Sequence, residues 1–254
     1  MFFRRISAVL LCFLVPLSSA VTLAQSAATT THKRKTAQKK GAKSRKSRTT
    51  VTPAHRQKLH RAFVASSELR PMAKQLLEQP SPVAYTAVER YAVRHSADEG
   101  GMLAHLVLGY AHLQDKDYAK ADRDLKLAAV PGSELSDYAD FFLAQSAAAA
   151  SPDQQRVAAL LKGFGEKHPD SLFIRSAEVM RANALIGSNQ TDEAIHVLES
   201  MRDNKPDVEL ALGHAYASAG QTAKAVSIWN HLSESAGSFP SVIVLSLCVG
   251  GLLT

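Results

Sequence analysis

The sequence predicts an all-α fold, and more narrowly a right-handed α-solenoid built from helical hairpins. From Ala54 onward, apolar residues recur at helical spacing with almost no β-branched alternation. Beyond Gly100 the chain is also quasi-periodic, and corresponding positions recur at intervals of 36, 37 and 31 residues. At such a period each unit is a pair of antiparallel helices, and pairs of this kind stack into a solenoid.

The charge of the chain is unevenly divided. The formal net charge of the 254 residues is +7, but residues 1–67 hold 14 of the 30 Lys and Arg residues and no acidic residue. The remainder therefore carries 16 basic and 23 acidic side chains, a net charge of −7. Because phosphate contacts need clustered cations on the folded body, we expect no nucleic-acid binding there.

Residues 1–24 have the three parts of a secretory signal peptide. Arg4 and Arg5 precede an apolar run from Ile6 to Leu17, and small residues allow cleavage after Ala20 or Ala24. The run is shorter than the roughly 20 residues of a membrane span. The sequence thus predicts a periplasmic or secreted protein, with an uncleaved N-terminal anchor as the alternative.

Residues 25–53 are predicted to be a disordered basic linker. Nine cations fall within residues 33–48, and the segment has no aromatic residue and little to bury. Such a stretch repels itself and cannot offset its ordering entropy. We expect this arm to bind an anionic surface of lipid headgroups or cell-wall polymers. A solvated linker without a dedicated partner is the alternative.

Residues 54–100 are predicted to form N-terminal helices. The apolar spacing places two helices at His55–Leu69 and Pro82–His95, with a weaker one at Met72–Glu78. Ser81 before Pro82 has the pattern of an N-cap followed by proline at the first helical position.

Residues 101–232 hold the repeats. Small residues let the two helices of a unit approach closely, and a large residue four positions after the small residue of the second helix fills the groove between units. The small residues include Gly109, Ala121, Gly213 and Ala225, and the large ones are Leu125, Leu161, Leu198 and Trp229.

This pattern resembles the tetratricopeptide repeat family. Leu212-Gly213-x2-Tyr216 followed by Ala225-x3-Trp229 is the best match. The first unit departs from the family pattern at His112, which stands in a usual aromatic position. The second departs at Gln145, which stands where a small glycine belongs, and at Val157, which replaces alanine. The resemblance covers about residues 101–232 and implies stacked helical hairpins.

A narrower likeness is carried by four segments. They resemble the superhelical region of soluble lytic transglycosylases, periplasmic enzymes that cleave peptidoglycan with a separate catalytic domain. The segments are Tyr91–Ser96, Gly109–His112, Leu135–Asp140 and Lys167–Phe173. The family's catalytic glutamate lies in a Glu-Ser setting, but Glu199-Ser200 and Glu234-Ser235 lack the surrounding motif. The likeness therefore implies the scaffold without the enzyme.

The sequence predicts no catalytic residue, no metal site and no cofactor. His105 and His112 lie at packing positions of the repeat and are expected to be core histidines. The carboxylate pairs Asp115/Asp117 and Asp122/Asp124 are expected on a turn and on a solvated helix face. Nucleotide-binding, zinc-binding and nucleophile-elbow motifs do not occur in the sequence.

Recognition is expected on the concave face, which the first helix of each pair lines. The repeat register places four side chains there: Tyr110, Gln114, Asn183 and His214. Packing between adjacent helices is the alternative role for each. The predicted function is an exported scaffold that binds a partner protein or peptidoglycan. The alternative is a truncated, non-catalytic N-terminal part of a lytic murein transglycosylase.

Residues 233–254 form an atypical apolar tail. A polar stretch is followed by a nearly continuous apolar run at residues 242–253, too short to span a bilayer as a helix. A solenoid normally ends on a polar capping helix. Three interpretations remain open: a segment folded back on the last unit, a tip that binds membrane or a partner, and the artificial end of a longer protein.

Overall fold

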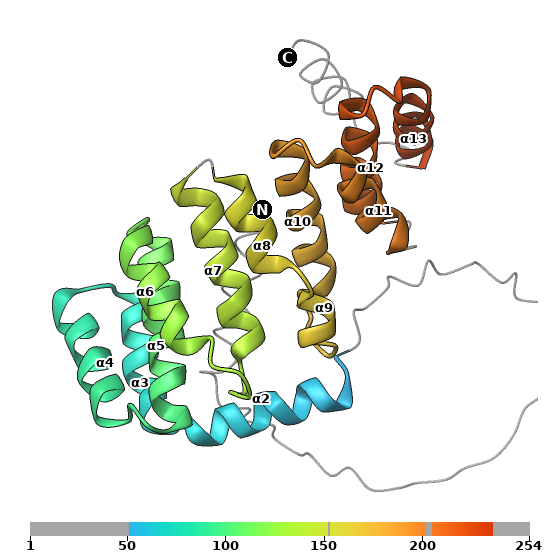
Figure 1. The fold of residues 1–254 in the computed structure, drawn as a ribbon. Helices are drawn as coiled ribbons and strands as arrows, with labels where there is room; N and C mark the ends of the chain where they lie inside the picture. Colours follow the sequence, from blue (N-terminus) through green and yellow to red (C-terminus); the bar gives the residue numbers. More distant parts are fainter. Residues whose placement is uncertain (1–50, 152, 202–204, 236–254) are drawn as a thin grey trace, which may run out of the picture. The chain divides into compact units, whose positions relative to one another are not determined.

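The computed structural model describes residues 51–151, 153–201 and 205–235 (Figure 1). Regular structure in these ranges is helical and none of their residues forms a strand, which confirms the all-α class. The predicted signal peptide, the basic arm up to residue 50 and the tail from residue 236 lie outside the described residues. In the described ranges, no helix combines the length and apolar content of a membrane span.

Three helices precede the repeats: α2 (Pro53–Ala65), α3 (Leu69–Glu78) and α4 (Pro82–Arg94). The prediction of one helix over His55–Leu69 is wrong, because the chain turns after Ala65. The Ser66 amide donates to the Ala62 carbonyl at 3.0 Å, and its hydroxyl donates to the Phe63 carbonyl at 3.2 Å.

The N-cap predicted for α4 is confirmed. The Ser81 hydroxyl accepts a hydrogen bond from the Ala84 amide at 3.2 Å, and Pro82 occupies the first turn. Both features supply what a helix start requires, namely an acceptor for an unpaired amide and a residue that needs no amide partner.

In the predicted repeat region, the helices follow one another as hairpins. The pairs are α5 (Glu99–Gln114) with α6 (Tyr118–Ala128), α7 (Ser136–Ala150) with α8 (Gln154–Leu161), α10 (Ile174–Gly187) with α11 (Thr191–Ser200), and α12 (Pro206–Ser218) with α13 (Thr222–Ser235). The one-turn helix α9 (Phe164–Lys167) stands before the third pair. Besides its own partner, each of α6, α8 and α11 packs on the first helix of the next pair.

Three of the four large repeat residues identified in the sequence are core residues, and the fourth, Trp229, is half-buried. Leu125 and Leu161 are 0% exposed and Leu198 is 2% exposed, each on a second helix. A Cβ atom on Gly109 would lie 2.6 Å from Leu125 Cγ, and one on Gly213 would overlap the Trp229 indole. The small residues therefore do allow close helix approach, as the sequence predicted.

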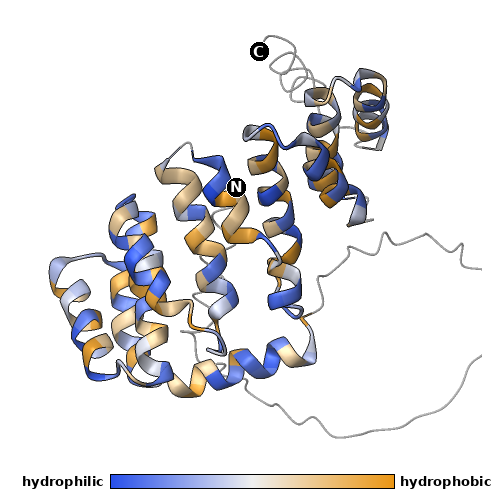
Figure 2. Ribbon diagram, in the orientation of Figure 1, coloured by the Kyte–Doolittle hydropathy of each residue, from blue (hydrophilic) through white to orange (hydrophobic). Residues whose placement is uncertain are grey.

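Burial is not uniform along the first helices. Apolar residues, orange in Figure 2, form bands along the helices. Every residue of α5 from Leu106 to His112 is buried, and α7 is buried from Ser136 to Ala144 except at Asp140. In contrast, α10 and α12 keep several apolar residues only half-buried.

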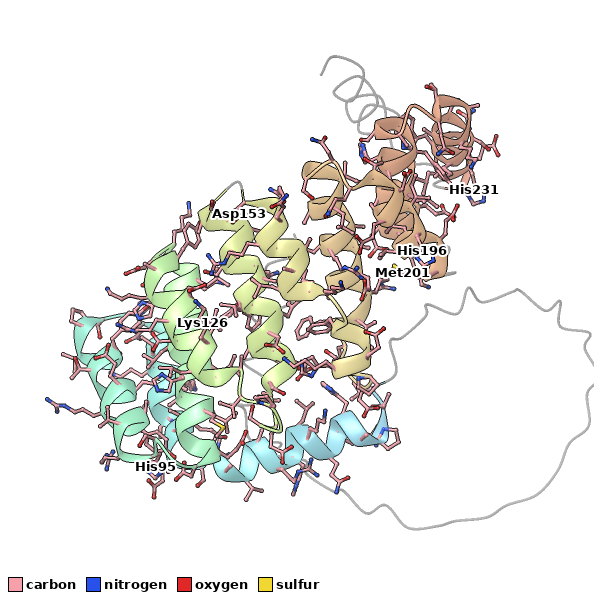
Figure 3. The ribbon with its side chains drawn as sticks, viewed as in Figure 1. His95, Lys126, Asp153, His196, Met201 and His231 are labelled. Atoms are coloured by element: carbon pink, nitrogen blue, oxygen red, sulfur yellow. The ribbon has the colours of Figure 1, made fainter. Side chains whose placement is uncertain are left out.

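Charged side chains on the outside cap helices and join neighbours (Figure 3). The Asp153 carboxylate is the N-cap of α8 and accepts a first-turn amide at 3.0 Å. Lys126 Nζ lies 2.7 Å from Asp122, one turn earlier on α6. His231 Nδ1 lies 3.4 Å from Glu209 and links α13 to α12. Ion pairs on an exposed surface stabilise a fold only slightly, whereas an N-cap of this kind contributes about 1 kcal/mol.

Helix α2 contacts more than one hairpin. The ring of His55 stacks on Tyr138 of α7 with 6.2 Å between centroids. Arg61 Nη2 donates to the Glu134 carboxylate, just before α7, at 2.8 Å. Helix α2 also packs on α5. In Figure 1, α2 is drawn in blue along the lower ends of these helices.

Candidate functional site

The four residues predicted to line a groove fall on α5, α10 and α12 but differ in exposure. Tyr110 is 4% exposed, and its ring is tilted against Phe142 of the next hairpin with 5.0 Å between centroids. The exposure expected for Tyr110 is therefore wrong, because its ring is part of the core. Gln114 and Asn183 are exposed and His214 is half-buried, so a role in binding stays a prediction for these three.

Two first helices carry a stripe that the sequence analysis identified only in part. We call it the α10–α12 surface, and it consists of the half-buried or exposed residues Val179, Asn183, Ile186, Leu210 and His214. Members on the same helix are three or four positions apart, so they share a face. Helices α10 and α12 pack on each other, so the two parts of the stripe lie on adjacent first helices.

The same repeat positions are covered in the earlier hairpins. Leu106 of α5 is 4% exposed and Phe142 of α7 is 0% exposed, whereas their counterparts Val179 and Leu210 are half-buried. The apolar members Val179, Ile186 and Leu210 could have been found from the sequence, because they lie three or four positions from Asn183 or His214. Their exposure could not, because it depends on what packs over each hairpin.

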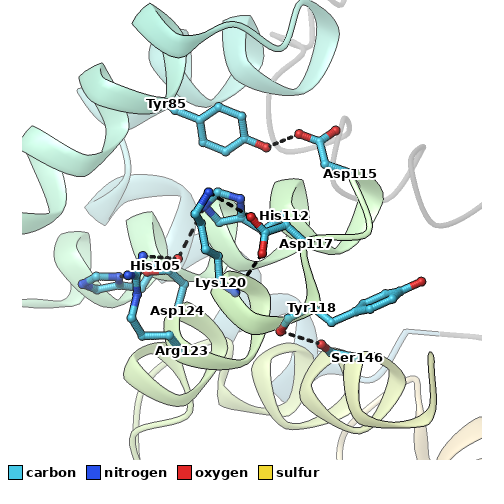
Figure 4. Close-up of polar contacts among 10 residues, drawn as sticks. All are labelled: Tyr85, His105, His112, Asp115, Asp117, Tyr118, Lys120, Arg123, Asp124 and Ser146. Atoms are coloured by element: carbon cyan, nitrogen blue, oxygen red, sulfur yellow. Dashed lines mark hydrogen bonds and ion pairs between the residues drawn. The ribbon is translucent and has the colours of Figure 1, made fainter. Parts of the chain in front are cut away.

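A polar cluster lies inside the α5–α6 hairpin (Figure 4). Asp124 is 3% exposed, and its Oδ1 lies 3.1 Å from His105 Nδ1. Its Oδ2 lies 3.7 Å from His112 Nε2 and 3.5 Å from Arg123 Nη2. A buried carboxylate is costly unless it is paired, and these contacts offset the cost.

The prediction that Asp122 and Asp124 share a solvated face is wrong for Asp124. Residues two apart on a helix point in very different directions, so one of the pair can be buried while the other is not. Asp122 is half-buried and pairs with Lys126 and with Arg156 of α8. Asp124 instead faces the histidines of its own hairpin.

His112 lies at the boundary between α4 and α5. Its ring, on α5, stacks on Tyr85 of α4 with 4.6 Å between centroids. Burial lowers the pKa of His112, and the Asp124 carboxylate opposes this only in part. The Tyr85 hydroxyl donates to Asp115 at 2.7 Å, and burial together with this bond raises the pKa of Tyr85. Both rings therefore favour their neutral forms.

The turn between α5 and α6 holds Asp115 and Asp117, as predicted. Lys116 between them has φ 62°, the left-handed conformation that ends a helix. Asp117 is the N-cap of α6 and accepts the Lys120 amide at 3.2 Å. The hydrogen bond from Lys120 lowers the pKa of Asp117. Asp117 therefore pairs with α6, and Asp115 with Tyr85 of α4, so both carboxylates have structural partners.

A second cluster joins two segments that carry the narrower likeness. Asp140 Oδ2 lies 2.7 Å from His168 Nε2 and 2.6 Å from Lys167 Nζ. The Ser171 hydroxyl donates to Asp137 at 2.6 Å. Burial alone would raise the pKa of Asp140, but the hydrogen bonds from His168 and Lys167 outweigh it and lower the pKa. The segments Leu135–Asp140 and Lys167–Phe173 thus form one junction.

Helix α2 covers this junction. Thr52 Oγ1 donates to Asp170 at 3.4 Å, and His55 lies 1% exposed against Tyr138. Burial lowers the pKa of His55; the Asp137 and Asp170 carboxylates act in the opposite direction, and Lys58 reinforces the lowering. Burial also raises the pKa of Tyr138. The His55–Tyr138 contact is thus one between two neutral rings.

The chemistry of both clusters is that of buried structural pairs. Among the described residues, no group of three or more His, Cys, Asp or Glu side chains is placed to hold a metal ion. Glu199, one of the Glu-Ser pairs, accepts a hydrogen bond from the Tyr216 hydroxyl. This bond, with burial, raises the pKa of Tyr216 to about 12, so Tyr216 remains a donor at neutral pH. The other, Glu234, is exposed near the end of α13.

Comparison with family models, with curated proteins and with solved structures found no match to this chain. The interpretation of its function therefore rests on the residues and their contacts.

Proposed function

We propose that the chain is a right-handed α-solenoid of tetratricopeptide-like hairpins that acts as a binding scaffold outside the cytoplasm. Its ligand is a partner protein or a component of peptidoglycan, and the α10–α12 surface is where it binds. The observation that carries this proposal is the half-buried stripe on α10 and α12, at positions that are covered in α5 and α7.

The composition of the stripe suits recognition. Val179, Ile186 and Leu210 offer apolar area that a ligand can remove from water. Asn183 offers an amide and His214 an imidazole, which can orient a peptide or a sugar through hydrogen bonds. A mixture of apolar contact with a few polar groups is typical of specific binding surfaces.

Two features support the scaffold part of the proposal. Leu125, Leu161 and Leu198 are buried on second helices, and Gly109 and Gly213 let the two helices of their own units approach closely. The buried Asp–His pairs hold helices together at α5–α6 and at the junction before α10. The link to peptidoglycan is supported by the likeness of that junction to the superhelical region of lytic transglycosylases.

The proposal can be tested with purified full-length protein and purified peptidoglycan sacculi. Co-sedimentation measures binding to the polymer, and chemical cross-linking in cells followed by mass spectrometry identifies protein partners. Val179→Asp and Leu210→Asp should abolish the interaction, because each places a charge in the apolar part of the stripe. Leu127→Asp is the matched control, since Leu127 is 50% exposed on α6, away from the stripe.

Equal binding by the stripe variants and the wild type would contradict the proposed surface. The same sacculi can be assayed for soluble muropeptides. Their release by the purified chain would show lytic activity and would contradict the proposal of a scaffold without a catalytic residue.

A further inference from the structure

Helix α13 exposes apolar positions that are covered in the preceding hairpins. The comparison concerns the position three residues before the large groove-filling residue of each second helix. At this position Ala158 of α8 is 7% exposed and Ile195 of α11 is 9% exposed, whereas Val226 of α13 is 44% exposed. The groove-filling residue itself is buried in α6, α8 and α11, whereas Trp229 packs its indole on Gly213 and His214 of α12 and is half-buried overall. We call Val226 and Trp229, with the polar residues one turn to either side, the outer face of α13.

This face has a counterpart inside the chain that shows what normally covers it. At the equivalent position of α6, Asp122 forms an ion pair with Arg156 of the next hairpin. Helices α8 and α11 pack on α10 and α12, the first helices of the hairpins that follow them. The outer face of α13 is therefore the side on which the next element of the stack would pack.

We propose that the outer face of α13 is covered by residues 242–253 of the same chain. Nine of these twelve residues are apolar, so the segment can supply the contact that a following helix supplies elsewhere. In helical form it would be about 18 Å long, close to the roughly 21 Å of the 14-residue α13.

The length of the connecting chain fits the same arrangement. Residues 129–135 join α6 to α7, and residues 201–205 join α11 to α12. Residues 236–241 connect the end of α13 to the apolar segment, and this connection is shorter than the first of these two and longer than the second. A short linker also gives the segment a high effective concentration at α13, so it competes well against a second copy of the chain.

Cys248 lies within the apolar segment and allows a direct test. In a full-length Cys12→Ser background, a second cysteine is introduced on the outer face of α13 in three separate variants: Thr222→Cys, Val226→Cys and Ser233→Cys. Ser227→Cys is the matched control, because its side chain points about 100° away around the helix. Each protein is oxidised with diamide over a range of protein concentrations, and the disulfide is mapped by peptide mass spectrometry.

At least one outer-face variant should form an intrachain disulfide with Cys248 about tenfold faster than the control, since the bond requires Cα atoms about 4.4–6.8 Å apart. The rate should not depend on protein concentration. Covalent dimers that form faster at higher concentration would overturn the proposal in favour of a second copy. Equal rates for the control and all outer-face variants, or thiols that stay free in all of them, would also overturn it.

Discussion

The contact between Gly109 and Leu125 gives a quantitative test of the repeat packing. A Cβ atom on Gly109 would lie 2.6 Å from Leu125 Cγ and 3.0 Å from the Leu125 backbone nitrogen. Both distances are shorter than van der Waals contact. Overpacking of this kind costs about 1–3 kcal/mol, while Gly→Ala inside a helix gains about 1 kcal/mol. Gly109→Ala should therefore lower the free energy of unfolding by up to about 2 kcal/mol.

The cause can be isolated with a double-mutant cycle. Leu125 is 0% exposed, so Leu125→Ala alone should cost about 2–5 kcal/mol. It also removes the Cγ atom against which the new methyl group clashes. In the Leu125→Ala background only the 3.0 Å approach to the backbone nitrogen remains, so Gly109→Ala should cost clearly less than in the wild type, with a coupling energy of about 1–3 kcal/mol. Urea denaturation followed by circular dichroism at neutral pH measures all four proteins.

Gly187→Ala is the control for this cycle. Its Cβ atom would lie 2.9 Å from Cγ of Gln154, a flexible side chain that can move aside. The variant should be neutral or up to about 1 kcal/mol more stable than the wild type. Effects of Gly109→Ala and Leu125→Ala that add within about 0.5 kcal/mol would refute the close-approach argument, as would an equal loss in Gly187→Ala.

Two further predictions concern acid stability. Asp140→Asn should cost about 1–3 kcal/mol at pH 7, because His168 and Lys167 lose their carboxylate partner. The folded pKa of Asp140 lies below its ordinary 3.8, so the carboxylate stabilises the fold above pH 3.8 and this stabilisation is lost as the pH falls through the folded pKa. Denaturation midpoints measured from pH 7 to pH 2 should therefore fall less in Asp140→Asn than in the wild type. Because the folded pKa of His55 lies below its ordinary 6.5, the unfolded chain takes up the proton first, so wild-type stability should begin to fall below pH 6.5. His55→Phe should show a shallower decline over that range in the same titration, and an unchanged slope would contradict the burial of a neutral imidazole.

The helical class and the groove-filling positions could be predicted because they depend on local spacing. Leu125, Leu161 and Leu198 repeat at the period of the hairpin, and each is buried as the pattern requires. The small residues Gly109 and Gly213 could be identified in the same way, because they too recur at fixed positions of the repeat. The N-cap at Ser81 was predictable too, because its hydrogen bond reaches only three residues along the chain.

The burial of particular polar residues could not be predicted, because it depends on contacts between distant segments. Asp124 meets His105, nineteen residues away, and its neighbour Asp122 carries the same charge but stays half-buried. His55 is buried because its ring packs on Tyr138 of α7, which lies 83 residues further along the chain. Tyr110 has the repeat position of a groove residue, yet Phe142 packs against its ring.

Helix α2 should couple units that would otherwise unfold separately. In the solenoid that we propose, each repeat would contact its neighbours only, and local stability would vary from unit to unit. Here α2 contacts α5, Tyr138 of α7 and Asp170 before α10. His55→Asp would place a carboxylate in this buried contact near Asp137 and Asp170, and the repulsion should release α2.

Hydrogen–deuterium exchange with mass spectrometry tests this coupling. In the His55→Asp protein, exchange should rise in α2, in the first turns of α7 and in residues 168–173, while α12 and α13 keep their wild-type rates. Lys58→Asp is the matched control. It introduces the same carboxylate one turn further along α2, at a half-buried position outside the buried ring contact, so its effect should be confined to α2. A rise limited to α2 in both variants would mean that α2 rests on the hairpins without stabilising them. A uniform rise through α13 would mean that the described helices unfold as one cooperative unit, which contradicts neighbour-by-neighbour packing.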